Sequence, residues 1–190
     1  MSATSRGRVT AVKFIVAGGF GVGKTTFVGA ISEIEPLQTE AAMTTVAQRV
    51  DDASGVAAKT TTTVAMDFGR LTVDSTLVMY LFGAPGQERF HFMWDDLVTG
   101  ALGAVVLVDP RRLSDCFASI DYFESRSVPF VVGVNRFPSG NYHTLYEVAD
   151  ALGIGPGVPI MDCDARVRHS ARDVLLALLE LLVGRFAVAR

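Results

Sequence analysis

The sequence has few cysteines, few charged residues and no long hydrophobic run. Its two cysteines stand outside any CxxC or Cys/His pattern, which argues against a disulfide framework and a zinc site. Charged residues make up 19% of the chain and the formal net charge is −3, which does not suit a nucleic-acid-binding surface. The apolar runs are shorter than the ~18–20 residues of a spanning helix, and residues 1–12 lack the apolar segment of a signal peptide. We therefore expect a cytoplasmic protein, with no nucleic acid as partner and no direct membrane insertion.

Hydrophobic residues, in contrast, are abundant. They make up 49% of the 190 residues, enough for one domain with its own core. We expect a single domain over residues 1–190, with residues 1–9 as a flexible tail. Residues 35–62 are rich in small and polar side chains and too long for an ordinary connection, so we predict a mobile functional segment there.

Short β-rich runs alternate with amphipathic stretches, which is typical of a parallel sheet covered by helices on both faces. The runs at 64–68 and 77–82 flank a turn at Asp74-Ser75 and are typical of a hairpin. We predict a three-layer α/β fold whose mostly parallel sheet has one antiparallel strand, from the hairpin over 64–82. The other expected strands are residues 12–17, 104–108, 130–134 and 158–161, and the expected closing helix is 172–186.

A glycine-rich motif follows the first expected strand. Gly18-x-x-x-x-Gly23-Lys24-Thr25 matches the P-loop pattern at all four fixed positions, between a strand and a helix as its mechanism requires. In such a loop backbone N–H groups surround the phosphates, Lys24 reaches the β and γ oxygens, and the Thr25 hydroxyl binds Mg²⁺. The fold is therefore that of a P-loop NTPase, although the motif identifies neither base nor reaction. The predicted phosphate-binding residues are Gly18, Phe20, Gly21, Val22, Gly23, Lys24, Thr25 and Thr26.

Four further segments resemble, in order, the motifs of Ras-like small GTPases, and they cover most of the chain. Residues 61–69 (TTTVAMDFG) resemble the first switch, residues 83–90 (GAPGQERF) the second, and residues 135–138 and 164–166 the base-binding motifs. The resemblance implies GTP or GDP as ligand, Mg²⁺ as cofactor, and hydrolysis of GTP to GDP. It implies that Thr63 reaches Mg²⁺ and the γ-phosphate, although Thr60, Thr61 and Thr62 leave this register open by a residue or two.

In the second switch, the resemblance implies that the Gly86 N–H meets the γ-phosphate and that Gln87 orients the attacking water. Gln87 and Lys24 are thus the catalytic candidates. The switch departs from the family at Gly83, which stands where the family has an Asp that supports Mg²⁺ through water. Metal binding is then expected to depend on Thr25 and Thr63.

The base-binding tetrad, Asn135-Arg136-Phe137-Pro138, also departs from the family pattern. Asn135 is kept and the aliphatic stem of Arg136 is long enough to lie along a base, but Pro138 replaces the Asp that pairs with the guanine edge. In the last motif the backbone N–H of Ala165 is expected to meet the base oxygen. The predicted base-binding residues are Asn135, Arg136, Asp164, Ala165 and Arg166.

Other residues of interest receive a plainer interpretation. Phe20 stands where fast Ras-like proteins have a small Gly, so we expect its ring to crowd Gln87 and slow the reaction. Asp109 ends an apolar run like a metal-binding aspartate, but we interpret both Asp109 and Asp67 as structural. Core packing explains some members of the aromatic cluster Phe90, Phe92, Met93 and Trp94, but all four cannot face inward from one short helix. We therefore interpret the cluster as forming an exposed apolar patch for a partner, so that Trp94→Ala weakens partner binding and spares nucleotide affinity.

More narrowly, the chain resembles the small GTP-binding proteins encoded in actinobacterial conservon operons, in the segments GGFGVGKTT, TTTVAMDFG, LFGAPGQERF, FMWDDL and AVVLVDPRRL. This resemblance implies a bacterial signalling assembly with a sensor-kinase-like membrane protein and a roadblock-type light-chain-like protein, and recruitment to the inner face of the membrane by such partners. The long first-switch region resembles that of bacterial polarity GTPases, with Arg49 as a candidate arginine finger supplied in cis.

Two alternative functions stay open. A nucleotide-binding module that does not hydrolyse its ligand, a pseudo-GTPase in the same assembly, is favoured by Phe20, Gly83 and Pro138. A P-loop ATPase, or a kinase of small substrates, is favoured by Pro138 alone. The leading prediction is a Mg²⁺-dependent small GTP-binding switch with slow GTP hydrolysis.

Overall fold

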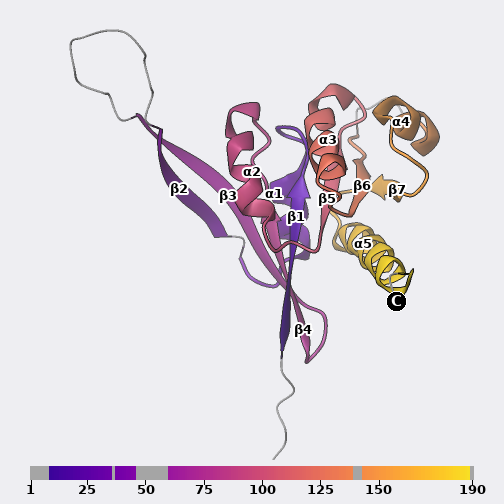
Figure 1. Cartoon of the computed structure of the whole chain (residues 1–190), viewed down its shortest axis with the longest axis horizontal. Helices are drawn as coiled ribbons and strands as arrows, with labels where there is room; N and C mark the ends of the chain where they lie inside the picture. The colour runs from indigo at the N-terminus through magenta and orange to yellow at the C-terminus, as the bar shows by residue number, and fades with distance from the viewer. Residues whose placement is uncertain (1–8, 36, 46–59, 139–142, 189–190) are drawn as a thin grey trace, which may run out of the picture.

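The structure is a computed structural model that describes residues 9–35, 37–45, 60–138 and 143–188. Within these ranges seven strands form one sheet in the order β2-β3-β4-β1-β5-β6-β7 (Figure 1). Of these strands β3 runs against the other six, because it pairs antiparallel with both β2 and β4 while the remaining pairs are parallel. This confirms the predicted sheet with one antiparallel strand. The strands are β1 Thr10–Ala17, β2 Leu37–Thr45, β3 Thr60–Thr72, β4 Leu77–Gly83, β5 Gly103–Val108, β6 Phe130–Asn135 and β7 Ile160–Cys163.

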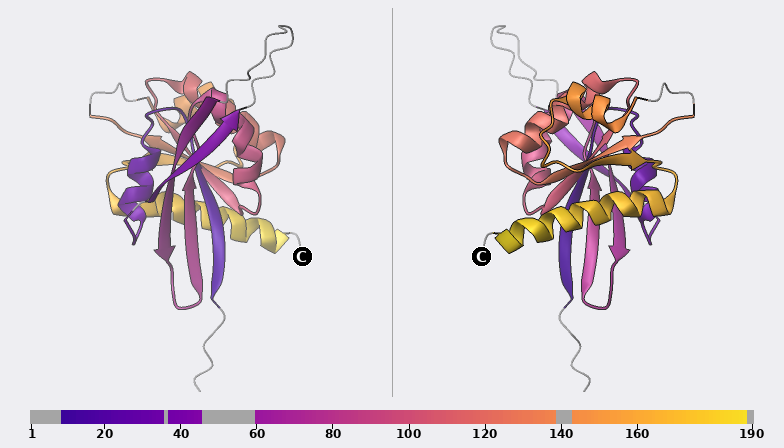
Figure 2. Two further views of the ribbon diagram at one scale, coloured as in Figure 1. Left: turned by 90° about the vertical axis from the view of Figure 1, so that its left-hand side faces the viewer. Right: turned by 90° about the vertical axis from the view of Figure 1, so that its right-hand side faces the viewer.

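Helices cover both faces of this sheet, as Figures 1 and 2 show. Consecutive residues of β1 serve the two faces alternately: Phe14 and Val16 join the core under α1 and α5, whereas Ile15 and Ala17 join the core under α2, α3 and α4. The sheet is therefore buried on both sides, which explains its continuous apolar runs. The helices are α1 Lys24–Ile31, α2 Trp94–Val98, α3 Phe117–Ser125, α4 Leu145–Leu152 and α5 Arg168–Val188, with 3₁₀ turns η1 Glu88–Met93 and η2 Leu113–Cys116.

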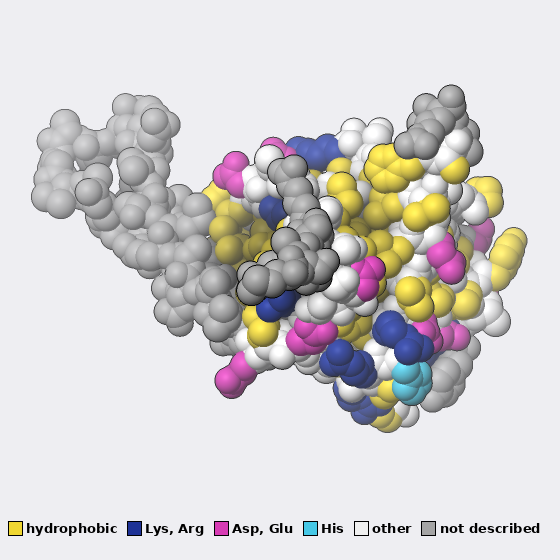
Figure 3. Space-filling model, turned by 90° about the horizontal axis from the view of Figure 1, so that it is seen from below, with side chains coloured by type: hydrophobic (Ala, Val, Ile, Leu, Met, Phe, Trp, Pro, Cys, Tyr) yellow, Lys and Arg dark blue, Asp and Glu magenta, His cyan; other side chains and the backbone are white. Residues whose placement is uncertain are grey.

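The helix α5 includes the expected closing helix and begins four residues earlier than expected. It packs Val174, Leu178 and neighbouring apolar residues into the core, and other apolar side chains remain outside. Figure 3 shows apolar side chains spread over the face seen from below, and the large exposed apolar residues of α5 are Leu176, Val183 and Phe186. In the described part of the chain no helix has the length and apolar character needed to cross a membrane.

The polar segment over 35–62 contains a strand that its composition did not predict. The backbone of β2 pairs along its whole length with β3, from Leu37 opposite Phe68 to Thr45 opposite Thr60, so β3 is also longer than expected. Pairing with a distant strand, rather than a local apolar pattern, explains β2. In Figure 1 the β2–β3 pair extends away from the helices. Residues 46–59, with Arg49, and residues 1–8 of the expected tail lie outside the described ranges.

The parallel strands bring the predicted motifs to one edge of the sheet. The P-loop follows β1, the second-switch residues follow β4, and the two base-binding segments follow β6 and β7. In open sheets of this type ligands bind at the carboxyl ends of the strands. The topology therefore places segments more than 100 residues apart in the sequence around one site.

Candidate nucleotide site

The P-loop turns sharply between β1 and α1, and glycine is required where it does so. Gly18 has a φ of 131°, and a Cβ there would lie 2.2 Å from the carbonyl oxygen of Leu107. Gly23 is the N-cap of α1 with a φ of 105°, and a Cβ there would lie 2.8 Å from Nδ2 of Asn135. Side chains at either position would strain the backbone and clash. These two glycines thus hold the sharp turn that connects the end of β1 to the amino end of α1.

The side chain of Lys24 crosses the mouth of this loop. Its Nζ donates to the carbonyl oxygens of Gly18 and Gly19, at 2.9 and 2.8 Å, and it lies 2.5 Å from where a Cβ on Gly86 would stand. Burial lowers the pKa of Lys24 to about 8, while Asp67 opposes this shift. One ammonium group therefore lies between the P-loop and the second switch, at the point where both were predicted to meet a γ-phosphate.

A cavity opens beside Lys24 and contains an acidic residue that we had interpreted as structural. Asp67 in β3 accepts a hydrogen bond of 2.7 Å from the hydroxyl of Thr25. The sequence signal for it was a carboxylate inside the apolar run VAMDFG, one strand away from the missing Asp at Gly83. The described lining residues are Phe20, Gly21, Gly23, Lys24, Thr25, Thr26, Asp67, Gly83, Ala84, Pro85 and Gly86.

Two residues of the predicted phosphate chemistry, Gln87 and Thr63, are not tested by the described lining of this cavity. Gln87 is partly buried at the start of η1 and is not among the lining residues. Thr63 lies within β3 opposite Ala42 of β2, and its side chain lies outside the described set. The roles of Gln87 in orienting water and of Thr63 in binding metal stay predictions.

The aromatic cluster after the second switch faces two ways, and the prediction that Trp94 belongs to an exposed patch is wrong. Trp94 is buried, its Nε1 donates to the carbonyl oxygen of Pro85 at 3.2 Å, and its ring stacks on Phe123. Phe90 is buried as well, whereas Phe92 is 59% exposed. A short helix packed against α3 must bury its inner face, which the sequence pattern of so few residues does not identify.

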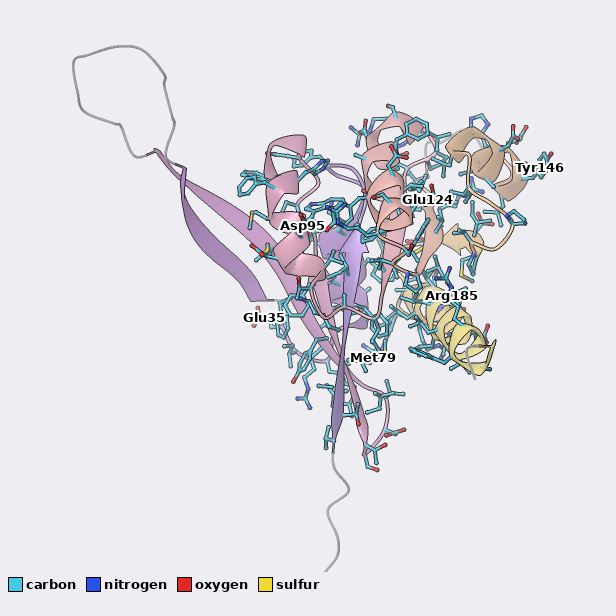
Figure 4. The ribbon with its side chains drawn as sticks, viewed as in Figure 1. Glu35, Met79, Asp95, Glu124, Tyr146 and Arg185 are labelled. Atoms are coloured by element: carbon cyan, nitrogen blue, oxygen red, sulfur yellow. The ribbon has the colours of Figure 1, made fainter. Side chains whose placement is uncertain are left out.

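The helix α2 is also tied to α3 by polar contacts. Asp95 lies on α2 on the side of α3 (Figure 4), where it accepts a hydrogen bond of 2.7 Å from the Tyr122 hydroxyl and pairs with Arg126 at 2.6 Å. The hydrogen bond from Tyr122 lowers the pKa of Asp95. The segment from Pro85 to α2 is thus attached to α3 through Trp94 and Asp95.

On the other side of the P-loop, Asn135 acts as a brace between segments. It is buried, its Nδ2 donates to the carbonyl oxygen of Val22 at 2.9 Å, and its Oδ1 accepts from the backbone N–H of Ala165 at 3.1 Å. The N–H expected to meet the base oxygen therefore donates to Asn135. This side chain joins the P-loop to the loop between β7 and α5.

A second hollow lies beyond this brace and contains two carboxylates. Asp162, which we had not considered, accepts from Arg136 at 2.6 Å, and Asp164 accepts two hydrogen bonds from Arg166 at 2.9 and 2.7 Å. These contacts to Arg166 lower the pKa of Asp164. Pro138 is exposed. The described lining residues are Arg136, Asp162, Cys163, Asp164, Val167, His169 and Ser170.

The loop after β5 contributes an arginine that sequence reasoning missed. Arg112 donates to the carbonyl oxygen of Phe20 at 2.8 Å and so holds the outer side of the P-loop. The neighbouring Asp109 is buried and accepts from the Arg111 side chain at 2.9 and 2.7 Å, and this contact lowers the pKa of Asp109. Its carboxylate is therefore used within its own turn, which agrees with a structural role.

Comparison with known proteins relates this arrangement to nucleotide-binding families. A family model described as conserved hypothetical ATP binding protein matches residues 16–184. An uncharacterized protein of Methanocaldococcus jannaschii is 29% identical over 135 residues, which are 70% of this chain and 75% of that protein. The Ras-related protein RABD2a of Arabidopsis thaliana is 24% identical over 135 residues, 66% of each chain.

Solved structures with a similar fold include the cytosolic domain of the T. maritima FeoB iron transporter. Its GDP form I has a TM-score of 0.65 and 16% sequence identity, covering 93% of this chain and 65% of that one. Its apo form has a TM-score of 0.62, also with 16% identity, covering 91% of this chain and 64% of that one. This chain spans less than two thirds of the length of these FeoB chains, and the likeness concerns the fold.

Proposed function

We propose that this chain is a Mg²⁺-dependent switch that binds GTP and hydrolyses it slowly to GDP. The premise is that the chain is a nucleotide-binding P-loop protein and belongs to the family of conserved hypothetical ATP-binding proteins. The observation that carries the proposal is the position of Lys24, whose Nζ bonds to the P-loop carbonyls and lies against Gly86 of the second switch. A γ-phosphate at this point would contact both segments at once. A diphosphate would leave the second segment without that contact, which is the physical basis of a switch.

Different residues of the site bind the phosphates, orient the attacking water and bind the metal ion. Lys24 replaces its neutral carbonyl partners by phosphate oxygens, and the N–H groups of the P-loop surround the β-phosphate. The N–H of Gly86 donates to the γ-phosphate, and Gln87, next along the chain, orients the attacking water. The Thr25 hydroxyl is one ligand for Mg²⁺, which when bound neutralises charge on the phosphate oxygens.

Movement of the second switch has a defined route out of the site. Pro85 lies directly before Gly86 and accepts the hydrogen bond of Trp94, whose ring packs on Phe123 of α3. A contact made at Gly86 therefore acts on a residue already fixed to α2 and α3. The buried Trp94 is the only tryptophan of the chain, so its fluorescence reports on this route.

Slow turnover and partner binding are supported by two exposed aromatic residues. Phe20 lines the cavity with 64% of its surface exposed, and Phe92 of η1 is 59% exposed. A ring at position 20 restricts access of water and of any arginine finger to the γ-phosphate. We propose that the partners are those of the conservon resemblance, a roadblock-type light-chain-like protein and a sensor-kinase-like membrane protein in a bacterial signalling assembly.

The second candidate function is a P-loop ATPase, and Pro138 is the observation that favours it. Pro138 carries no carboxylate for the guanine edge. The guanine switch instead requires another carboxylate to accept hydrogen bonds from guanine in place of the missing Asp. Asp162 and Asp164, which line the adjacent hollow, are the candidates for that role. The family description mentions ATP, so base preference is the property that separates the two functions.

The test is binding of a fluorescent guanine nucleotide to the purified chain with Mg²⁺, competed by GTP, GDP and ATP in turn, with Lys24→Ala as the control variant. Displacement by GTP and GDP at far lower concentrations than by ATP would support the guanine switch. Equal or better displacement by ATP would favour the ATPase. Tight binding without product formation over hours would favour the non-hydrolysing module, and binding unaffected by Lys24→Ala would refute the site itself.

A further inference from the structure

We propose that Asp67 supplies the metal-supporting carboxylate that the second switch lacks at Gly83, so that Mg²⁺ is held by Thr25 of α1 and Asp67 of β3. This inference rests on the proposed function and assigns a metal role to a residue that sequence reasoning had treated as structural. This carboxylate comes from β3, whereas the Asp of Ras-like proteins would stand at position 83 of the neighbouring strand, β4.

The register of the sheet places Asp67 beside Gly83. The strands β3 and β4 are antiparallel with Phe68 opposite Phe82, which aligns the next residues, Asp67 and Gly83, across the pair. A Cβ built on Gly83 would lie 2.9 Å from Oδ2 of Asp67 and 3.0 Å from its Cβ. The side chain of Asp67 thus occupies the space into which an Asp at position 83 would project. Because Gly83 has no side chain, the Asp67 side chain can occupy this space without a clash.

The contact of Asp67 is with the other expected metal ligand. Its Oδ2 accepts from the Thr25 hydroxyl at 2.7 Å, so two oxygen atoms from distant segments already lie together on the cavity wall. Mg²⁺ is bound by one or two protein oxygens together with phosphates and water, rather than by a cage of protein ligands. Within the described ranges, accordingly, no group of three His, Cys, Asp or Glu residues forms a metal cluster of its own.

The charge of Asp67 also suits a bound cation. Among the described residues lining the cavity, Asp67 is the one that carries a carboxylate. The other nearby candidate, Asp109, is paired with Arg111. The hydrogen bond described for Asp67 is with Thr25 and not with an arginine. Its charge is therefore available to a cation bound between Thr25, Asp67 and the phosphates.

The experiment measures how release of a fluorescent GDP from the full chain depends on Mg²⁺ concentration, for the wild type and for Asp67→Asn. Asparagine keeps the size and the acceptor for Thr25 but removes the charge. We expect Asp67→Asn to raise the Mg²⁺ concentration for half-maximal retention by about 10- to 100-fold, the usual effect of losing a metal-supporting group. Release in excess chelator should stay as in the wild type, because it involves no metal.

The decisive variant moves the carboxylate back across the sheet. In the double variant Asp67→Gly with Gly83→Asp, the carboxylate returns to β4 in the same space, and we expect the Mg²⁺ dependence to return toward that of the wild type. Asp74→Asn, at the far turn of the same hairpin, is the matched control; Asn there can still accept from the backbone of Thr76. Its Mg²⁺ dependence should equal that of the wild type.

The outcomes separate this inference from the proposed function. A folded Asp67→Asn variant with unchanged Mg²⁺ dependence would overturn the assignment while leaving nucleotide binding intact. Loss of retention at every Mg²⁺ concentration, with release in chelator also accelerated, would mean a purely structural role and would overturn it too. A wild-type chain that retains no guanine or adenine nucleotide would overturn the proposed function and this inference together.

Discussion

Replacing Asn135 by Ala removes the brace that joins the P-loop to the segment after β7. The substitution leaves the carbonyl oxygen of Val22 and the N–H of Ala165 without their partner, and the bonds lost are 2.9 and 3.1 Å long. Asn135 is only 5% exposed, so water does not readily replace these contacts. Each unsatisfied buried group costs about 1–3 kcal/mol, and we expect the free energy of unfolding to fall by about 2–5 kcal/mol.

The assay is urea denaturation of the ligand-free chain followed by circular dichroism, with the midpoint and slope fitted for each variant. In a chain of this size the loss corresponds to a fall in the thermal midpoint of about 4–20 °C. Arg166→Ala is the matched control, because it removes a predicted base-binding side chain that is exposed and paired with Asp164. It should leave the unfolding free energy close to that of the wild type.

A small effect would refute this reasoning. If Asn135→Ala unfolds within about 0.5 kcal/mol of the wild type, as an ordinary surface substitution does, the brace contributes nothing and Asn135 acts only on the base. The same variant should also bind nucleotide more weakly, because the P-loop loses a contact at Val22. Weakened binding with unchanged stability would assign Asn135 to the base and contradict the structural role.

Three further predictions concern the P-loop and the second switch. Lys24 has a pKa of about 8 in the free chain, and a bound phosphate would raise it. Nucleotide affinity should therefore be constant below pH 8 and fall by up to about tenfold per pH unit above it. Isothermal titration across pH 7–9.5 measures this profile, and an affinity that does not change with pH would contradict the prediction. Trp94→Phe keeps an aromatic ring but removes the donor to Pro85, so stability to urea should fall by about 1–3 kcal/mol; no loss of stability would show that this bond is unimportant. Phe20→Gly removes an exposed ring from the cavity wall. It should speed single-turnover GTP hydrolysis by about tenfold, which corresponds to a barrier lower by about 1.4 kcal/mol. An unchanged rate would show that Phe20 does not limit the reaction.

The P-loop could be predicted from the sequence because its phosphate-binding groups lie within eight consecutive positions. The eight positions from Gly18 to Thr25 contain the turn, the cation and the hydroxyl, and the steric requirement for glycine at Gly18 and Gly23 leaves a visible pattern. The buried strands β1, β5 and β6 were equally clear, since a sheet covered on both faces needs continuous apolar runs. The mostly parallel arrangement of the sheet followed, because strand, helix and strand alternate along the chain.

Features that depend on partners far away in the sequence were missed. The strand β2 has no apolar period of its own and is formed by pairing with β3. Trp94 belongs to a short helix whose inner face is chosen by α3 and by the carbonyl of Pro85. The Ala165 N–H was expected at the base because local sequence does not reveal that Asn135 accepts from it.

By itself, the sequence determined that this chain has a phosphate-binding loop in a doubly covered α/β sheet, because those properties depend on neighbouring residues and on the periodicity of burial. Only the tertiary structure decided which carboxylate faces the cavity. Thr25 and Asp67 are 42 positions apart, and a shift of one residue in the β3–β4 register would turn the Asp67 side chain to the opposite face of the sheet. The antiparallel pairing of β3 with β4 is what places this carboxylate beside Gly83.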